Sequence, residues 1–411
     1  MNAMDRRTFF KTSLFAAGGV VLGGLSGCEP RVTTYDEKTG MTYRRLGRTN
    51  IDVSVIALGC EGFSHKTPDE VRSEMDFAVS QGINFIDLYS SNPDLRSAIG
   101  YAIKGRRHKL VIQGHLGSAW QDGQYLRTRD MAMVRAAFED LLERLGTNYV
   151  DVGMIHYVDE QADYDAIMQG EFMEYVRKLK KKRRIRSVGL STHSVSIATQ
   201  AAQSGLIDVL MFSLSPGYDL TVENGRITGV APDRSALYEL CATNGVAIDV
   251  MKAFGGGNLL SDERSPFGHA LTPVQCIEYA LSRPGVASVM CGCNGLEQMK
   301  ADLAWTTATR KQRDFLPVLA SVTSADWKGI CMYCTHCAPC PQGIDVASVN
   351  KYLNLALAHS GEEIPETVRD HYNLLAHHAS ECIECARCER RCPFDVPIIS
   401  HMHKAAKVFG V

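Results

Sequence analysis

Short apolar runs recur along most of the chain, and amphipathic segments separate them. The runs with the length of buried strands are 53–58, 84–88, 110–113, 150–155, 187–190, 209–212, 247–251 and 288–290. Apolar positions three to four residues apart predict helices between them, most clearly over 68–80, 131–145, 235–244 and 273–282. Strands that alternate with helices in this way predict a (β/α)8 TIM barrel or a doubly wound parallel sheet.

Eight cysteines near the C-terminus form two runs, and each run ends before a proline. The first consists of Cys331, Cys334, Cys337 and Cys340. The second consists of Cys382, Cys385, Cys388 and Cys392. The second run has the CxxCxxCxxxCP spacing of bacterial ferredoxins, and the first is one residue shorter before its last cysteine. Two such runs predict two 4Fe-4S clusters.

In two-cluster ferredoxins the fourth cysteine of each run binds the other run's cluster. This rule pairs Cys392 with the first three cysteines of the first run and Cys340 with the first three of the second. Structural zinc and disulfides are the competing interpretations, because two CxxC pairs can close one tetrahedral site. Eight closely spaced thiolates and two Cys-Pro endings exceed what either alternative needs.

The segment between the cysteine runs is too long for a compact ferredoxin loop and has helical spacing. Its apolar side chains form two sets, Leu353, Leu355, Ala356 and Ala358, then Val368, Tyr372, Leu375 and Ala376. This part of the chain resembles the helical type of dicluster ferredoxin domain. We therefore assign residues 324–411 to a small, mostly helical iron–sulfur domain.

The N-terminus resembles a twin-arginine export signal that ends in a lipobox. Arg6 and Arg7 precede an apolar stretch that ends at Leu25-Ser26-Gly27-Cys28. That stretch is shorter than the roughly 20 apolar residues that span a bilayer. We expect residues 1–27 to be removed, Cys28 to be lipidated, 28–40 to form a linker, and the protein to be anchored on the periplasmic side of a membrane. An uncleaved anchor with an unmodified Cys28 is the alternative.

Composition and charge limit the partners and the size of the core that we expect. The formal net charge is −2 and the basic run 178–184 ends an amphipathic segment, so nothing favours a nucleic-acid partner. With 45% hydrophobic residues, the segment 41–323 can bury one large core. Twin-arginine export carries folded proteins, so clusters would be inserted before the thiols reach an oxidising compartment.

The opening segment Tyr43-Arg44-Arg45-Leu46-Gly47-Arg48-Thr49, with Val53-Ser54, resembles the first hairpin of the aldo/keto reductases. Further matches follow in family order at Phe85-Ile86-Asp87, 149–156, 188–191 and Gly292 with Leu296-Glu297-Gln298. The series covers about 41–303 and implies the TIM barrel of that family. It also implies NADP(H) binding at the C-terminal mouth of the barrel and carbonyl reduction.

The resemblance implies a catalytic aspartate, tyrosine, lysine and histidine, with the tyrosine as proton donor. Asp87 matches the aspartate and His156 the histidine, but Asn92 stands at the tyrosine position and His115 at the lysine position. Asparagine has no proton to donate near neutral pH, and histidine is a weaker permanent cation than lysine. Tyr89 is a replacement donor if its loop bends toward the site.

Histidines and an aspartate follow four consecutive predicted strands, at the barrel end where such enzymes place their chemistry. These residues are Asp87, His115, His156 and His193. They could act as acid and base, or could bind a divalent metal. A hydrogen-bonded structural role is the simpler interpretation for any one of the histidines. Cys60, Cys291 and Cys293 also reach this end, and we expect them to be buried small apolar residues.

The cofactor positions implied by the resemblance also differ from the family pattern. Ser191 and Thr192 stand where the family commonly has Ser-Asn, and Gly292 and Asn294 follow the last strand. A periplasm offers little NADPH, whereas a dicluster domain supplies electrons within the same chain. The sequence therefore favours a barrel that uses another electron source.

We expect an exported iron–sulfur oxidoreductase whose two clusters exchange electrons with a small-molecule substrate, a carbonyl or alcohol, or with a bound cofactor at the barrel mouth. A redox partner protein or another donor would supply or accept these electrons. One alternative is a noncatalytic electron-transfer or binding subunit with a degenerate barrel. The other is a conventional NADP(H)-dependent carbonyl reductase. The first hypothesis predicts that the iron–sulfur domain faces the mouth of the barrel.

Overall fold

The computed structural model describes residues 32–223, 226–319, 329–331, 333, 336–357, 364, 366–392 and 394–411. The predicted export signal, Cys28, Cys334 and Ala358 lie outside the described residues. Within the described part of the chain, no helix is both long enough and apolar enough to cross a membrane.

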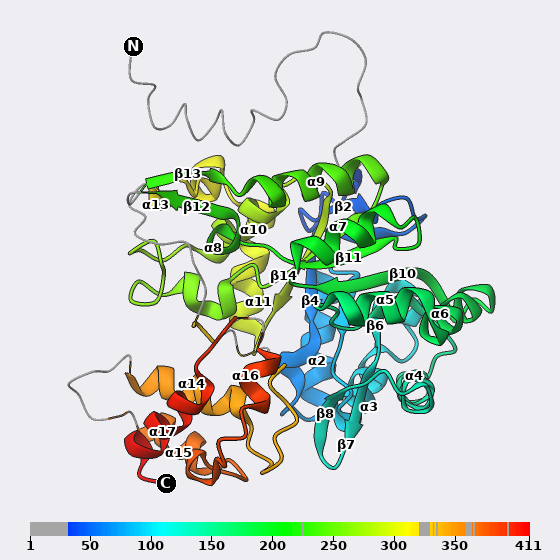
Figure 1. Cartoon of the computed structure of the whole chain (residues 1–411). Coiled ribbons are helices and arrows are strands. Elements are labelled where there is room, and N and C mark those ends of the chain that lie inside the picture. The colour runs from blue at the N-terminus through cyan, green and yellow to red at the C-terminus, as the bar shows by residue number, and fades with distance from the viewer. Residues whose placement is uncertain are drawn as a thin grey trace.

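Eight parallel strands close into a barrel (Figure 1). They are β4 (Ile56–Gly59), β5 (Phe85–Leu88), β6 (Val111–Leu116), β9 (Val150–Ile155), β10 (Ile185–Thr192), β11 (Val209–Ser213), β14 (Ala247–Met251) and β15 (Val286–Gly292). The strands are ordered around the barrel as in the chain, and Val289 pairs with Ile56 to close the ring. Seven of the predicted strands match single barrel strands, whereas the run 53–58 is divided, with Val53 and Ser54 in an antiparallel hairpin and 56–58 in β4. The closed ring confirms the barrel over the doubly wound sheet.

Helices surround these strands in the alternation that the sequence predicts. They are α2 (Pro68–Ser80), α3 (Pro93–Ile103), α4 (Met131–Leu145), α5 (Gln161–Gln169), α6 (Glu171–Lys181), α7 (Val195–Gln203), α9 (Pro232–Asn244), α10 (Pro273–Leu281) and α11 (Leu296–Leu303). Thr67 and Glu70 form a capping box that begins α2, and Gly146 adopts φ 61° where α4 ends. Helix α9 begins three residues before the predicted start, because Pro232 suits the first turn of a helix.

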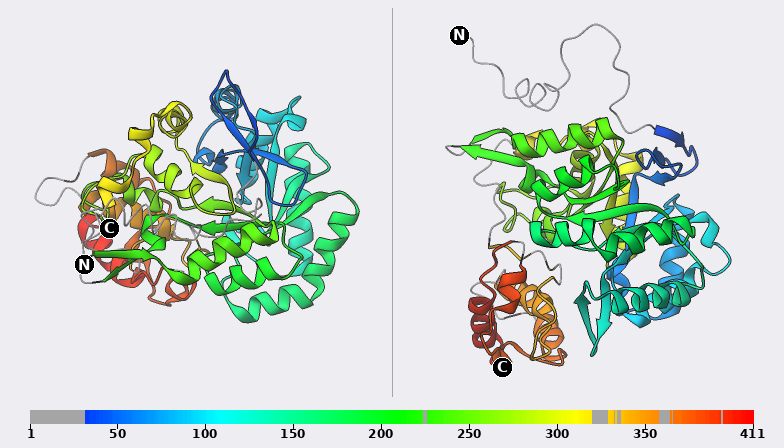
Figure 2. Two further views of the ribbon diagram at one scale, coloured as in Figure 1. Left: turned by 90° about the horizontal axis from the view of Figure 1, so that it is seen from above. Right: turned by 45° about the vertical axis from the view of Figure 1, so that its right-hand side comes forward.

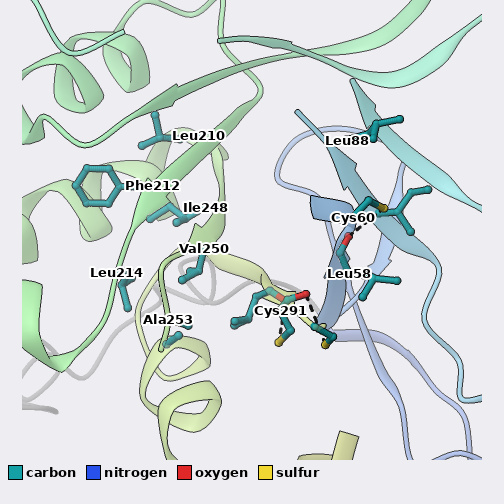
Figure 3. Close-up of a cluster of buried hydrophobic side chains, with 14 of the residues drawn as sticks. Leu58, Cys60, Leu88, Leu210, Phe212, Leu214, Ile248, Val250, Ala253 and Cys291 are labelled. Atoms are coloured by element: carbon teal, nitrogen blue, oxygen red, sulfur yellow. Dashed lines mark hydrogen bonds between the residues drawn. The ribbon is translucent and has the colours of Figure 1, made fainter. Parts of the chain in front are cut away.

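The hairpin at the start of the chain closes one end of the barrel. Strands β1 (Val32–Tyr35), β2 (Thr42–Arg45) and β3 (Asp52–Ser54) form an antiparallel sheet. Leu46 and Val53 of this hairpin share a buried cluster with Phe85 and Met154 from the barrel strands. A second, larger cluster packs the strands against the helices, and Figure 3 shows part of it around Phe212 and Val250.

The opposite end of the barrel carries inserted segments. A hairpin of β7 (Ser118–Gln121) and β8 (Gln124–Arg127) follows β6, and η3 (Gly255–Leu260) follows β14. The segment after β11 contains α8 (Pro216–Asp219), β12 (Leu220–Glu223) and β13 (Arg226–Val230). Shorter helical turns are η1 (Cys60–Phe63), η2 (Arg107–Lys109), η4 (Ala304–Thr307), α12 (Arg310–Arg313) and α13 (Leu316–Leu319).

The C-terminal domain is helical, as predicted. It contains α14 (Val346–Leu357), α15 (Glu366–Asn373), η5 (Ala379–Glu381), α16 (Arg387–Arg391) and α17 (Ile398–Phe409). The rings of Tyr372 and Phe409 stack 3.9 Å apart and join α15 to α17. Figures 1 and 2 show these orange to red helices at the end of the barrel opposite the blue hairpin.

Candidate active site

The C-terminal domain contacts the barrel end that holds the carboxyl termini of the strands. The Tyr157 hydroxyl, just after β9, donates to the backbone oxygen of Arg391 at 2.9 Å. The backbone N–H of Cys340 donates to Gln124 Oε1 in the β7–β8 hairpin at 3.3 Å. The His336 ring stacks on Tyr157 with centroids 3.9 Å apart and planes 14° apart. The cysteine-bearing domain therefore faces the mouth of the barrel.

A continuous row of four buried side chains begins at this mouth and runs into the barrel. The Tyr125 hydroxyl lies 2.5 Å from His156 Nε2. His156 Nδ1 lies 2.7 Å from His115 Nδ1, and His115 Nε2 lies 2.9 Å from Asp87 Oδ1. Three predicted residues, Asp87, His115 and His156, are thus brought together, and Tyr125 joins them from a separate hairpin.

Burial controls the charge of His156. Desolvation lowers the pKa of its imidazole well below the ordinary value, and the nearby His115 and His336 rings lower it further. His156 is therefore neutral near pH 7. A neutral imidazole carries one N–H and one acceptor nitrogen, so this ring can accept a hydrogen bond on one side and donate on the other.

A second carboxyl group lies deeper in the barrel. The Gln113 amide nitrogen donates to Asp87 Oδ1 at 2.9 Å and to Asp249 Oδ2 at 2.8 Å. Burial, followed by the charge of Asp87, raises the pKa of the Asp249 carboxyl well above its ordinary value. Asp249 is therefore neutral near pH 7.

Aromatic rings from both domains enclose His156. The Tyr89 ring lies parallel to it, with centroids 5.9 Å apart, and the His336 ring lies 6.3 Å away. The Tyr89 side chain is hydrogen-bonded to Glu61. Desolvation raises the pKa of the Glu61 carboxyl, although part of this residue is exposed to solvent. The hydrogen bond from Tyr89 lowers the same pKa and so opposes the effect of desolvation. Tyr89 therefore forms a wall of the site, while Tyr125 contacts His156 through its hydroxyl.

His193 lies at the domain interface beside this row. Its Nδ1 atom is 2.9 Å from Asp159 Oδ2, and the Thr192 hydroxyl donates to Asp159 Oδ1. Burial raises the pKa of the Asp159 carboxyl, but the contacts with His193 outweigh that effect and lower it. The His193 ring lies edge-on to His336 at 5.1 Å and to Phe394 at 5.5 Å. The Asp159–His193 pair thus helps to position the C-terminal domain.

Three cysteines of the second run line a cavity in the C-terminal domain. Cys382, Cys385 and Cys388 share this cavity with Cys340 and Cys337 of the first run. Its other walls are mostly apolar, with Ile344, Val346, Ile383, Ile399 and Met402 among them. Among the described residues, no group of three or more His, Cys, Asp or Glu side chains is placed to hold a single metal ion. The sulfur ligands and the apolar walls fit a 4Fe-4S cluster.

A family model for the aldo/keto reductase family matches residues 55–271. The chain belongs to the aldo/keto reductase family. A second model, for a 4Fe-4S dicluster domain, matches residues 330–397. The barrel and the iron–sulfur domain predicted from the sequence are therefore both confirmed at the level of family.

Related proteins match the barrel over nearly their whole length. The uncharacterized oxidoreductase YqkF of Bacillus subtilis is 26% identical over 306 residues, which cover 70% of this chain and 98% of the relative. The holo form of the aldo-keto reductase AKR11C1 from Bacillus halodurans has a TM-score of 0.56 at 23% identity, covering 69% of this chain and 98% of its own. A putative aldo-keto reductase, PA4992 from Pseudomonas aeruginosa, has a TM-score of 0.51 at 22% identity and covers 67% and 97%. These two structures support the shared fold.

Asn92, which the sequence resemblance predicts at the tyrosine position of the aldo/keto reductases, has a structural role. Asn92 lies at the start of α3, where its side-chain oxygen accepts from the N–H groups of Asp94 and Leu95. That is an N-cap role, which the following proline at the first helical position reinforces. The structure therefore does not bring Asn92 into the row of residues around His156.

The side chains at the predicted nicotinamide positions are already occupied. Ser191 Oγ accepts from the Tyr157 N–H at 2.7 Å, and the Thr192 hydroxyl donates to Asp159 at 2.8 Å. Both residues are buried, whereas Gly292 and Asn294 are exposed at the end of β15. Ser191 and Thr192 thus do not fit the nicotinamide end of NADP(H).

Tyr125 and His336 are site residues that no sequence pattern singled out. Tyr125 is the one that is hydrogen-bonded to His156. It lies on β8, in a hairpin that interrupts the expected passage from β6 to α4. The available signal was Asp122-Gly123, a pair typical of tight hairpin turns, and both residues have positive φ. A hairpin of four-residue strands is too short to register as an apolar run.

The predicted burial of the barrel cysteines is confirmed. Cys60, Cys291 and Cys293 are buried, and burial raises the pKa of each thiol. The Cys293 thiol donates to Asp302 Oδ2 at 3.1 Å. Burial also raises the pKa of the Asp302 carboxyl, to about 7. These thiols are therefore protonated core groups and not nucleophiles.

Proposed function

We propose that this protein is an iron–sulfur oxidoreductase in which the barrel mouth exchanges electrons with clusters of the C-terminal domain. The observation that carries the proposal is the position of His336. This residue precedes Cys337 in the chain, stacks on Tyr157 and lies 6.3 Å from the ring of His156. A residue next to a cysteine of the first run therefore contacts the rings that enclose the candidate active site.

A second contact connects the last cysteine of the same run, Cys340, with the same site. The Cys340 N–H is hydrogen-bonded to Gln124, and the next residue, Tyr125, is hydrogen-bonded to His156. The chain thus places two short connections between cysteines and His156. Such connections support electron exchange without a diffusing carrier.

The cysteines supply ligands for two clusters. By the spacing rule, Cys340 would hold one cluster with Cys382, Cys385 and Cys388, and the cavity that these four residues line fits that assignment. Cys331, Cys334, Cys337 and Cys392 would hold the other. When bound, the clusters would donate and accept electrons one at a time.

The residues of the barrel would bind and protonate the substrate. Asp87, His115, His156 and Tyr125 are placed to exchange a proton at the mouth, and the surrounding rings exclude water from it. A small carbonyl or alcohol is the substrate class that family membership suggests. Because Ser191 and Thr192 do not present free polar groups, electrons from the clusters take the place of those from NADPH.

The test uses the full chain with its clusters, purified without oxygen. After reduction with dithionite and removal of the excess, the protein is mixed with a panel of small aldehydes and ketones. We expect some of them to restore the visible absorbance of the oxidised clusters while the matching alcohol forms. His336→Leu should slow this recovery, and His371→Leu, which removes an exposed histidine of the same domain, should not.

Two outcomes would contradict the proposal. Carbonyl turnover that consumes NADPH and is unaffected by loss of the clusters would show a conventional reductase. Reduced clusters that no carbonyl oxidises, together with oxidised clusters that no alcohol reduces, would leave a noncatalytic electron-transfer or binding subunit. In that second case a redox partner protein would be the only source and destination of the electrons.

We also propose that the protein is exported by the twin-arginine route and anchored through lipidated Cys28. The paired arginines and the Leu-Ser-Gly-Cys sequence support this, as does the need to insert clusters before export. Mass spectrometry of the N-terminal peptide from membranes should find Cys28 as the first residue with a lipid attached. An intact N-terminus on the isolated protein would contradict it, and Cys28→Ala should release the protein from the membrane.

A further inference from the structure

We propose that Tyr125 exchanges a proton with the substrate and that His156 and His115 pass this proton between Tyr125 and Asp87. The identity of the substrate rests on the proposed function. The relay itself is a property of four described side chains. It assigns to the β7–β8 hairpin the task that Asn92 cannot perform.

The contacts are continuous from the mouth to the interior of the barrel. The three distances along the row are 2.5 Å, 2.7 Å and 2.9 Å, each within hydrogen-bonding range. Tyr125 is 8% exposed, and the three inner residues are each less than 5% exposed. A proton can therefore move along the row without meeting bulk water.

The chemistry of the groups restricts where the protons lie. Asp87 Oδ1 accepts from the Gln113 amide, and His115 Nε2 donates to the same oxygen. When His115 is neutral, its Nδ1 must accept, so His156 donates through Nδ1. His156 Nε2 then accepts from the Tyr125 hydroxyl. This arrangement leaves Tyr125 ready to take a proton from a substrate hydroxyl.

A substrate hydroxyl gives its proton to the Tyr125 oxygen, and the Tyr125 proton moves to His156 Nε2. The proton on His156 Nδ1 moves to His115 Nδ1, so His115 becomes an imidazolium beside the Asp87 carboxylate. The reverse sequence delivers one proton to a carbonyl oxygen.

The proton relay explains why a histidine, His115, suits the position where the family resemblance implies a lysine. A lysine at the position of His115 would hold its proton near neutral pH, whereas an imidazole can release and accept one. Asp87 stabilises the imidazolium through a charge-assisted hydrogen bond at 2.9 Å. Asp249 is neutral because of its burial and the charge of Asp87, so it does not compete for that proton.

Tyr89 provides a matched control. It lies as close to His156 as Tyr125 does, with ring centroids 5.9 Å apart against 5.6 Å. Its ring is parallel to the imidazole, and its side chain is hydrogen-bonded to Glu61. Removing the Tyr89 hydroxyl should therefore leave the relay intact.

The test observes the protons directly, with the full chain carrying oxidised clusters and 15N-labelled histidine. Long-range proton–nitrogen correlation spectra report which ring nitrogens carry a proton. We expect a protonated Nε2 on His115 and a single proton between the two Nδ1 atoms. Tyr125→Phe should change the signals of His156 and His115, whereas Tyr89→Phe should leave their protonation unchanged.

Asp87→Asn distinguishes a relay from separate contacts. In a relay, loss of the carboxylate changes the protonation of His115 and of His156, although only His115 touches Asp87. A change confined to His115, or an unprotonated His115 Nε2 in the unsubstituted protein, would overturn the proposal. Iron content and far-UV circular dichroism of each variant show whether it is folded.

The relay and the proposed function can fail separately. If the spectra show the relay but no carbonyl oxidises the reduced clusters, the electron route is wrong and the proton path stands. If carbonyls oxidise the clusters but Tyr125→Phe leaves both histidines unchanged, the relay is wrong and the electron route stands.

Discussion

Replacement of Asp219 by alanine is expected to lower the free energy of unfolding of the barrel by about 3–5 kcal/mol. Asp219 is fully buried and accepts hydrogen bonds from Arg234, Tyr238 and Tyr279. Without the carboxylate, the guanidinium of Arg234 stays buried with no compensating charge, and two tyrosine hydroxyls lose their acceptor. The cost therefore comes mainly from groups that the substitution leaves behind.

The measurement is urea unfolding followed by far-UV circular dichroism, on preparations with equal iron content. Tyr279→Phe is the matched control because it removes one hydroxyl from the same carboxylate and should cost about 1 kcal/mol. A loss of less than 1 kcal/mol in Asp219→Ala would mean that water reaches and solvates Arg234.

This network also connects barrel stability with the domain interface. Asp219 ends α8. The ring of the preceding residue, Tyr218, lies 6.0 Å from the ring of Phe394 in the C-terminal domain, measured between the ring centroids. The Asp219 backbone also accepts from the Ala231 N–H at 2.7 Å. Loss of the side-chain network should therefore loosen the loop that supports Phe394 as well as the barrel wall.

The barrel could be predicted from the sequence because its strands are buried on both faces. Such strands appear as continuous apolar runs, as 150–155 and 247–251 do, and each matches an observed strand. The ends of these runs also located Asp87, His115 and His156, since side chains that follow parallel strands meet at one end of a barrel. The order and direction of the strands thus predict that Asp87, His115 and His156 lie at the same end of the barrel.

The rest of the site depends on features that strand topology does not encode. Tyr125 reaches His156 only because a short hairpin folds back over the mouth, and His336 reaches Tyr157 only because a second domain docks there. The resemblance predicts Asn92 at the tyrosine position, but its side chain caps the start of α3, a local role typical of Asn before proline. The contacts of Tyr125 and His336 depend on tertiary packing, so no local pattern predicts them.

Cysteine substitutions are expected to remove whole clusters, and the pattern of loss tests which ligands belong together. Cys340→Ser and Cys382→Ser should each lower the iron content from about eight to about four atoms per chain, because each removes one ligand of one cluster. The cavity that contains both residues supports a shared cluster. Iron and acid-labile sulfide analysis gives the count, and Cys276→Ser, a buried cysteine of α10, should keep about eight.

Double substitutions decide the pairing. If Cys340 and Cys382 bind the same cluster, the Cys340→Ser/Cys382→Ser variant should keep about four iron atoms, as either single variant does. The Cys382→Ser/Cys392→Ser variant should lose nearly all iron, because its two cysteines would then bind different clusters even though they lie in one run. If each run instead binds its own cluster, the two results exchange. The first double variant would then lose nearly all iron and the second would keep about four atoms.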